Sequence, residues 1–540
     1  MKLKKNFFLD VFFLATISLL IIALSFLFSI YHSDFHHWGF IASHALDYIN
    51  GGKLFEEIIV QYGVGQLIIF KFINYFYEIN FTSIGVITSV FYSLNLIIIY
   101  FIVKRLSSIF YAFFIVTLIL FINPFVEFPW PDYIAGLWLS LFCFFLICGN
   151  PKKNSHYLLA GLCLFLSIIF RTSYILNIFA TCIIYFIFFK KNKKFYNKFL
   201  VNSLLTFLFL LIFYILYLLL EQNFINWFYQ GIGIFKNYAF ASEDPSFNTK
   251  GNLAFDIYHK YGYWSLVFFQ TAKLTAKFII QLIFPTSLEN FVIFIFFFVN
   301  ILFIFSFFNK KIKNFIGFNK NAQSNKLLFI ALLGFFGMIQ SIQFFNFFKN
   351  INSSSGILLT TSIVLISLNR SKFFYNRKYY YIFIILFFFI FKFFDTLKKN
   401  FQINYNNYFK SSIDFFGNRK FIKEDLDFYD SMKEYLCEGN KRIINFTLDT
   451  NFLYLCSRYK YYFYKFNVLN LQKDNFFNNF NNDIVDNSLI FVTTTDPLDI
   501  KKFAIKKVVD APKSISYWIE RTPGPLPHKH RSNKVNIYKN

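Results

Sequence analysis

The chain has 540 residues, of which 56% are hydrophobic and 15% are charged. A soluble globular protein carries about 25% charged residues, so this composition excludes an ordinary soluble chain. The formal net charge is +25, but the basic residues lie in short runs between apolar segments, which indicates membrane topology rather than a nucleic-acid partner.

Long apolar runs predict an all-α polytopic membrane protein, because a bilayer core requires about 18 or more apolar residues in a helix. When the basic runs between them are placed in the cytoplasm, about eleven spans alternate without conflict. This orientation leaves the N-terminus inside and the C-terminus outside. The predicted spans are 7–30, 82–103, 107–125, 133–149, 156–170, 173–189, 199–220, 290–308, 326–345, 355–369 and 378–394.

Two further apolar segments do not fit this alternation. Segment 64–78 is short and contains Lys71 and Glu78, and segment 264–284 carries Lys273 and Lys277 one turn apart. Charges on one face of an apolar helix are typical of an amphipathic helix at a membrane interface, so we expect both segments at the outer surface. If both crossed the membrane instead, there would be about thirteen spans.

The predicted topology divides the chain into two regions. Residues 1–394 form a transmembrane domain with outer loops at 31–81, 125–133 and 221–289, and residues 395–540 form an extracytoplasmic tail. The tail segments KRIINFTLD, SLIFVTTTD and FAIKKVVDA have the pattern of short strands between helical stretches, which favours a small α/β domain. Cys437 and Cys456 lie in this tail, where the compartment would permit a disulfide between them.

The first outer loop contains the first polar side chains after the N-terminal span. Asp34 follows the predicted end of that span. It is either a hydrated loop acid or a partly desolvated general base for a reaction at the membrane surface. Further candidates for substrate binding in this loop are His36, His37, Glu56, Glu57 and Tyr62.

The second outer loop, NPFVEFPWPDY, carries Glu127 and Asp132, and Pro124, Pro129 and Pro131 stiffen it between two helices. These acids are either hydrated or converge with Asp34 on a divalent metal ion or on one substrate hydroxyl. Histidines together with carboxylates could also bind a divalent metal ion, although the chain has no HExxH spacing. The sequence therefore leaves the metal requirement open.

Arg171 lies in a very short turn between two predicted spans, which places its guanidinium near the outer membrane surface. An arginine there binds either lipid headgroups or, bidentately, the phosphate of a lipid-linked substrate. Lys273 and Lys277 are further candidates for phosphate contact. The predicted spans contain few internal charges, which disfavours an ion-coupled transporter.

Together, these features resemble the GT-C fold integral-membrane glycosyltransferases, in particular bacterial relatives of the protein O-mannosyltransferase and aminoarabinose transferase groups. The resemblance rests on Asp34 after the first span, on the pair Gly51 and Gly52 after a helical stretch, and on the turn 61–63 (Gln-Tyr-Gly). The segment from Gly161 to Arg171 also resembles a glycine-containing helix of this family that ends in a basic residue. Val64 stands where the family often has proline, and no second acid follows Asp34 directly.

The resemblance implies an enzyme of the bacterial plasma membrane. It would transfer a sugar, with inversion, from a polyprenyl-phosphate-linked donor to a lipid, glycan or protein acceptor on the outer face. Asp34 would be the general base, Asp132 or Glu127 a second acid, and Arg171 or an interfacial lysine the contact to the leaving phosphate. The alternatives are a lipid or glycan flippase or transporter, and a non-catalytic envelope assembly protein.

Overall fold

The structure is a computed structural model of the whole chain. It describes residues 2–31, 37–56, 58, 60, 62–150, 152–191, 197–232, 300–309, 324–340, 378–401, 405–411, 416–437, 442–445, 462–463, 489–493, 504–510 and 534–539, with isolated positions between 260 and 298, at 311–312 and at 455.

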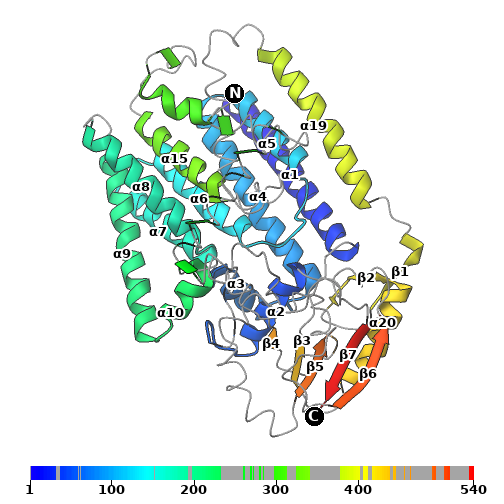
Figure 1. Cartoon of the computed structure of the whole chain (residues 1–540). Helices are drawn as coiled ribbons and strands as arrows, with labels where there is room; N and C mark the ends of the chain where they lie inside the picture. The colour runs from blue at the N-terminus through cyan, green and yellow to red at the C-terminus, as the bar shows by residue number, and fades with distance from the viewer. Residues whose placement is uncertain are drawn as a thin grey trace.

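Helices stand side by side and form the larger part of the molecule (Figure 1). In the described residues this bundle consists of α1 (Lys2–Tyr31), α4 (Phe81–Leu106), α5 (Ile109–Ile122), α6 (Asp132–Cys148), α7 (Asn154–Phe170), α8 (Tyr174–Lys191), α9 (Lys198–Leu220), α15 (Ser324–Gln340) and α19 (Lys378–Phe401). Three helical stretches are long and apolar enough to cross a membrane, namely Phe7–Tyr31, Phe81–Leu106 and Lys198–Leu220. This result agrees with the prediction of a membrane protein with several spans.

Five further predicted spans correspond to shorter helices, and one lies outside the described residues. The spans predicted at 107–125, 133–149, 156–170, 173–189 and 326–345 coincide with shorter apolar helices of the bundle. The span predicted at 355–369 lies outside the described residues. The total of about eleven spans therefore stays a prediction.

Local sequence signals explain several helix starts. Asn80 caps α4 by accepting a hydrogen bond from the backbone N–H of Ser83, whose side chain returns the contact to the backbone of Asn80. Ser108 and Asn197 cap α5 and α9 in the same way, through side-chain oxygens. Such caps satisfy backbone N–H groups that have no partner within the helix.

Two apolar cores meet at α4. One core joins α1, α4 and α5, and the other joins α4 to α6, α7, α8, α9 and α15. Because α4 contributes buried side chains to both cores, it forms the centre of the bundle.

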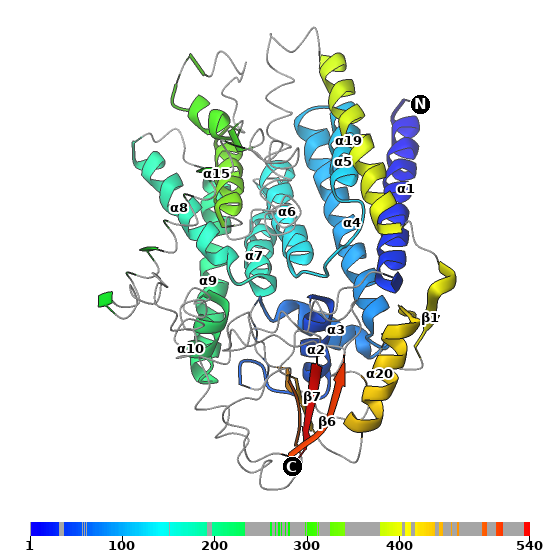
Figure 2. The same ribbon diagram turned by 45° about the vertical axis from the view of Figure 1, so that its right-hand side comes forward.

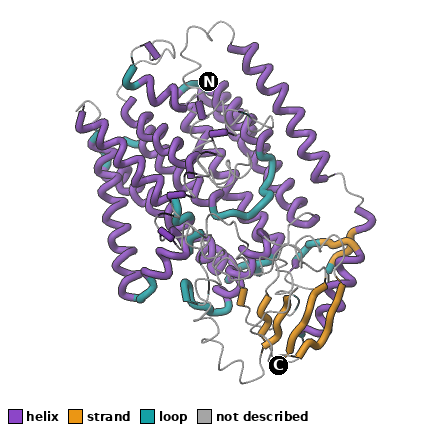
Figure 3. The backbone as a smooth tube through the Cα atoms, viewed as in Figure 1, coloured by secondary structure: helices purple, strands orange, loops and turns teal. Residues whose placement is uncertain are grey.

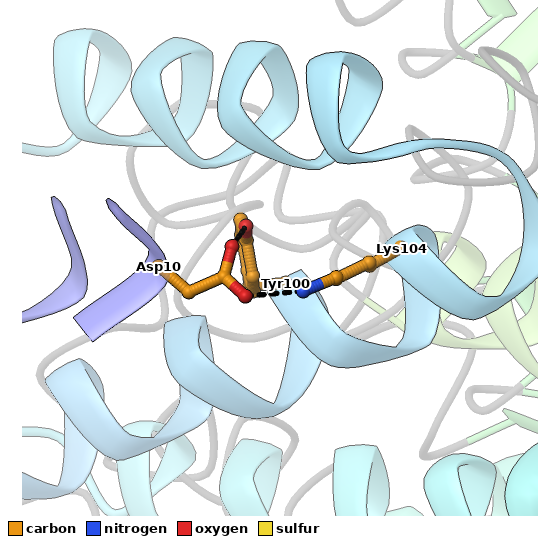
Figure 4. A network of polar contacts seen from close by, with 3 residues as sticks. All are labelled: Asp10, Tyr100 and Lys104. Carbon is orange, nitrogen blue, oxygen red and sulfur yellow. Dashed lines mark hydrogen bonds and ion pairs between the residues drawn. The ribbon is translucent and has the colours of Figure 1, made fainter. Parts of the chain in front are cut away.

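A polar cluster lies between α1 and α4 (Figure 4). Lys104 forms an ion pair with Asp10, and the Tyr100 hydroxyl donates a hydrogen bond to the other carboxylate oxygen of Asp10. The Asp10 side chain is 6% exposed and the Lys104 side chain 34% exposed. An ionised carboxylate is costly to bury without a partner, so these contacts fix the register of the two helices.

Two short helices lie across one end of the bundle, between it and the strands (Figure 2). They are α2 (His37–Ile49) and α3 (Gly65–Asn74). One side of α3, including Gln66 and Phe70, is buried, whereas Ile68 and Phe72 are exposed. Ten residues of helix extend about 15 Å, so α3 is too short to cross a bilayer, as its amphipathic sequence predicts. Lys71 of α3 donates to the carbonyl of Tyr48 at 3.0 Å.

The C-terminal strands gather at this same end, opposite the N-terminus (Figures 1 and 3). The order of the five-stranded sheet is β4-β3-β5-β7-β6, with β3 parallel to β4 and β5 and with β7 antiparallel to β5 and β6. The strands are β3 (Arg442–Asn445), β4 (Tyr462–Phe463), β5 (Leu489–Thr493), β6 (Ala504–Asp510) and β7 (Lys534–Lys539). Of these, β3, β5 and β6 fall in the three segments predicted as strands.

A smaller unit connects the bundle to this sheet. It contains the 3-10 turn η5 (Tyr405–Asn407), the antiparallel pair β1 (Tyr408–Lys410) and β2 (Lys420–Ile422), and α20 (Lys423–Leu436). The buried Arg419 lies with its guanidinium 4.9 Å from the ring of Phe81, the first residue of α4. Tyr408 packs edge-on against Tyr31 at the end of α1. This unit therefore holds the ends of α1 and α4.

The cysteines are divided between the two regions. Cys143, Cys148, Cys163 and Cys182 of the bundle are free thiols. Cys437, which follows α20, is disulfide-bonded, and its partner lies outside the described residues. Disulfides persist in oxidising compartments, and the extracytoplasmic location of the tail stays a prediction.

Candidate functional site

Three segments that are distant in sequence meet at the end of the bundle where α3 lies. They are 62–66 before and within α3, 127–132 before α6, and 171–174 between α7 and α8. The backbone N–H of Thr172 donates to the Tyr62 carbonyl at 2.7 Å. The Gln66 side chain donates to the Pro129 carbonyl at 2.8 Å. These bonds fix the first and second predicted outer loops to the α7–α8 turn.

Two glycines allow the first of these segments to approach α7 closely. A Cβ atom on Gly63 would lie 2.5 Å from the carbonyl oxygen of Ile169, and one on Gly65 would lie 2.8 Å from the ring of Phe170. Any side chain at either position would push the segment away from the end of α7. The close contact therefore depends on glycine at both positions.

Asp132 and Arg171 form an ion pair where these segments meet. Arg171 Nε lies 3.3 Å from Asp132 Oδ1, and the side chains are 16% and 1% exposed, respectively. The Nε–H has no well-aligned hydrogen-bond acceptor among the described residues, so the contact is electrostatic. The Tyr174 hydroxyl also lies 3.3 Å from Asp132 Oδ1 and donates to it.

The aromatic surroundings of the pair come from both predicted outer loops. The Arg171 guanidinium lies over the ring of Tyr62, with Cζ 4.5 Å from the ring centroid. Tyr62 in turn meets Trp130 edge-on, with centroids 5.0 Å apart. A cation over an aromatic ring is attracted to the negative face of the ring, so Tyr62 supports the guanidinium from one side.

The position of Asp132 follows from the proline-rich loop. Asp132 is the first residue of α6 and follows Pro131, and an acid in the first turn of a helix interacts favourably with the helix dipole. The Trp38 indole of α2 donates to the Glu127 carbonyl at 2.7 Å and fixes the start of this loop. The side chain of Glu127 is half-buried.

The structure thus brings together three of the residues singled out from the sequence, namely Tyr62, Asp132 and Arg171. Glu56 is separate from them. It is exposed and faces Lys53 at 3.6 Å. Six of the residues singled out have no described side chain: Asp34, His36, His37, Glu57, Lys273 and Lys277. Their predicted roles stay predictions.

Sequence analysis missed Gln230, which lies in the π-helical turn η2 (Phe228–Ile232) after α10 (Phe224–Trp227). Its buried amide accepts a hydrogen bond from the Val60 N–H at 2.8 Å and donates one to the Phe55 carbonyl at 2.9 Å. Phe55 has a φ of +67°, a conformation that is costly for a bulky residue. Gln230 therefore holds a strained segment that leads directly to Tyr62, and no local sequence signal marks this long-range contact.

The described residues contain no group of three or more histidine, cysteine, aspartate or glutamate side chains arranged to hold a metal ion. What the site offers is one buried carboxylate, one partly exposed guanidinium and three aromatic rings. Such a set suits the recognition of an anionic group, because the terminal nitrogens of arginine match phosphate oxygens in pairs.

No protein-family model and no curated protein matches this sequence. Among solved structures, the chain is similar to the crystal structure of ArnT from Cupriavidus metallidurans bound to undecaprenyl phosphate. The two share 9% sequence identity over 98% of this chain and 97% of that chain, with a TM-score of 0.45. At this identity and TM-score, the likeness assigns neither a fold nor an activity to this chain.

Proposed function

We propose that this chain is a membrane glycosyltransferase. It moves a sugar from a polyprenyl-phosphate-linked donor to a lipid, glycan or protein acceptor on the outer face of the membrane. The observation that carries the proposal is the position of Arg171, which is partly exposed and fixed by Asp132 and Tyr62 where the predicted outer loops meet.

The apolar bundle supports a lipid-linked donor. Three of the described helices are suited to cross a membrane, and a polyprenyl chain would remain in the hydrocarbon while its phosphate stays at the surface. Arg171 follows the last residue of α7 and begins the turn to α8. In the proposed topology this turn faces the outer surface, where the phosphate of a membrane-anchored lipid would lie.

The reaction needs one base and one group that stabilises the leaving phosphate. In the proposed reaction, Asp34 takes the proton of the acceptor hydroxyl, whose oxygen then forms a bond to the anomeric carbon. The bond between that carbon and the phosphate oxygen breaks, and its electron pair stays on the departing polyprenyl phosphate. Arg171 stabilises this developing negative charge. Attack opposite the leaving group inverts the anomeric configuration.

The first test compares Asp34→Asn with the wild type in a strain that lacks the protein. Glycan and lipid profiling of the complemented strains measures the transferred sugar. We expect the wild type to restore the missing modification and Asp34→Asn to lower transfer by about 100-fold or more, since general-base catalysis contributes about 10²–10⁴-fold.

Asp395→Asn is the matched control, because Asp395 is an acid of α19 that is half exposed and forms an ion pair with Lys399. It removes the same charge and should restore the modification fully. Equal rescue by Asp34→Asn and the wild type would exclude Asp34 as the base. Absence of any sugar-containing difference between the deletion strain and the complemented strain would exclude a glycosyltransferase.

A further inference from the structure

Asp132 is nearly closed to solvent. Its side chain is 1% exposed, and Oδ1 contacts both Arg171 and the Tyr174 hydroxyl. A general base must come within hydrogen-bond distance of the hydroxyl that it deprotonates. A carboxylate enclosed in this way is poorly placed for that task. Its location next to the proposed phosphate contact nevertheless indicates a role in the same reaction.

We infer that Asp132 is a positioning residue, which holds the Arg171 guanidinium in the orientation that binds the phosphate of a polyprenyl-phosphate-linked substrate. This inference rests on the proposed function, and it gives a definite role to Asp132, which the resemblance names only as one of two candidates for a second acid.

Burial raises the pKa of the Asp132 carboxyl, and two features oppose this effect and favour its anionic form. It occupies the first position of α6, where the helix dipole favours a negative charge. Arg171 lies within ion-pair distance. A fixed anion beside Nε determines which edge of the guanidinium faces the protein.

Tyr62 further restricts the orientation of the Arg171 guanidinium. Its ring lies against one face of Arg171, and its carbonyl is bonded to Thr172, the next residue in the chain. The guanidinium is thus held along the Nε edge and on one face. Its terminal nitrogens make no hydrogen bond to a described residue. The N–H groups of the two terminal nitrogens can therefore bind two phosphate oxygens side by side. A lysine ammonium group cannot form this bidentate contact.

The test measures the affinity for polyprenyl phosphate in the absence of turnover. A residue that only accepts a proton during the reaction would not change this affinity, whereas a residue that positions Arg171 would. A polyprenyl phosphate is titrated into purified full-length protein in nanodiscs, with phosphatidic acid and inorganic phosphate as competitors. We expect Asp132→Asn to weaken binding about tenfold or more, because the guanidinium loses its charged anchor. Arg171→Lys should have a similar effect, and Asp395→Asn should have none.

Asp132→Glu gives a second test with less risk to folding, since it keeps the charge and displaces the carboxylate by one methylene group. We expect weaker binding of the same kind, while the thermal unfolding midpoint stays near the wild-type value. A loss of stability without a loss of affinity, in either variant, would show a merely structural role and overturn the inference.

The remaining outcomes separate the inference from the proposed function. If the wild type binds polyprenyl phosphate and the Asp132 variants bind it equally well, the inference is wrong and the proposed function stands. If phosphatidic acid or inorganic phosphate competes as well as polyprenyl phosphate does, the site binds phosphate of another source, and the assigned substrate class is wrong. If the wild type does not bind polyprenyl phosphate, both fail.

Discussion

The polar cluster between α1 and α4 gives a quantitative prediction about stability (Figure 4). Replacing Lys104 by Met leaves the Asp10 carboxylate buried, with the Tyr100 hydroxyl as its remaining contact among the three residues of the cluster. Removing one partner of a fully buried ion pair costs about 3–5 kcal/mol. Because the Lys104 side chain is 34% exposed, water screens part of the pair, and we expect a loss of about 2–3 kcal/mol.

Asp10→Asn should cost less, about 1 kcal/mol, because the freed Lys104 amine can reach water and the new side-chain amide would still accept the Tyr100 hydrogen bond. Making both changes at once, Asp10→Asn with Lys104→Met, should cost less than the sum of the two single changes. In such a variant no unpaired charge remains buried.

A double-mutant cycle measures this coupling through the free energy of unfolding in mixed detergent micelles. The exposed pair of Asp395 and Lys399, with side chains 48% and 70% exposed and 2.9 Å apart, serves as the control. We expect a coupling of less than about 0.5 kcal/mol there. A coupling between Asp10 and Lys104 as small as that of the control pair would refute the reasoning.

Two further predictions concern the segment that leads to Tyr62. Gly63→Ala should lower both the thermal unfolding midpoint and sugar transfer. The new Cβ would lie 2.5 Å from the Ile169 carbonyl oxygen, a backbone atom that cannot rotate away. Unchanged thermal unfolding and unchanged transfer would contradict the close approach. Gln230→Leu removes both hydrogen bonds to Val60 and Phe55 and should destabilise the protein by about 2–4 kcal/mol, since each buried backbone group left unpaired costs about 1–3 kcal/mol. Amide hydrogen exchange at Val60 checks this directly, because exchange as slow as in the wild type would mean that another group replaces the amide.

Part of the candidate site could be predicted from residue type and position alone. Arg171 is a candidate because a very short turn between two apolar helices keeps a guanidinium near the membrane surface. Asp132 is a candidate because it ends a proline-rich loop. These are local features, and helix ends in a membrane protein follow from the length of each apolar run.

The contacts between these residues could not be predicted in the same way. The sequence left Asp132 and Glu127 as equal candidates, and only the fold directs Asp132 toward Arg171 while the backbone of Glu127 bonds to Trp38. Glu56 is a candidate from its place in the first outer loop, yet it is exposed and faces Lys53. Spacing along a loop does not reveal which side chains turn inward.

By itself, the sequence determined the membrane character of this protein, the amphipathic nature of α3 and three of the strands in the tail. Each depends on hydrophobic pattern over one short segment. The tertiary structure alone decided that Gln230 bonds to residues 170 and 175 positions away and that Arg171 rests on Tyr62. Such contacts depend on how helices pack against one another, and packing is set by the shapes of many side chains at once.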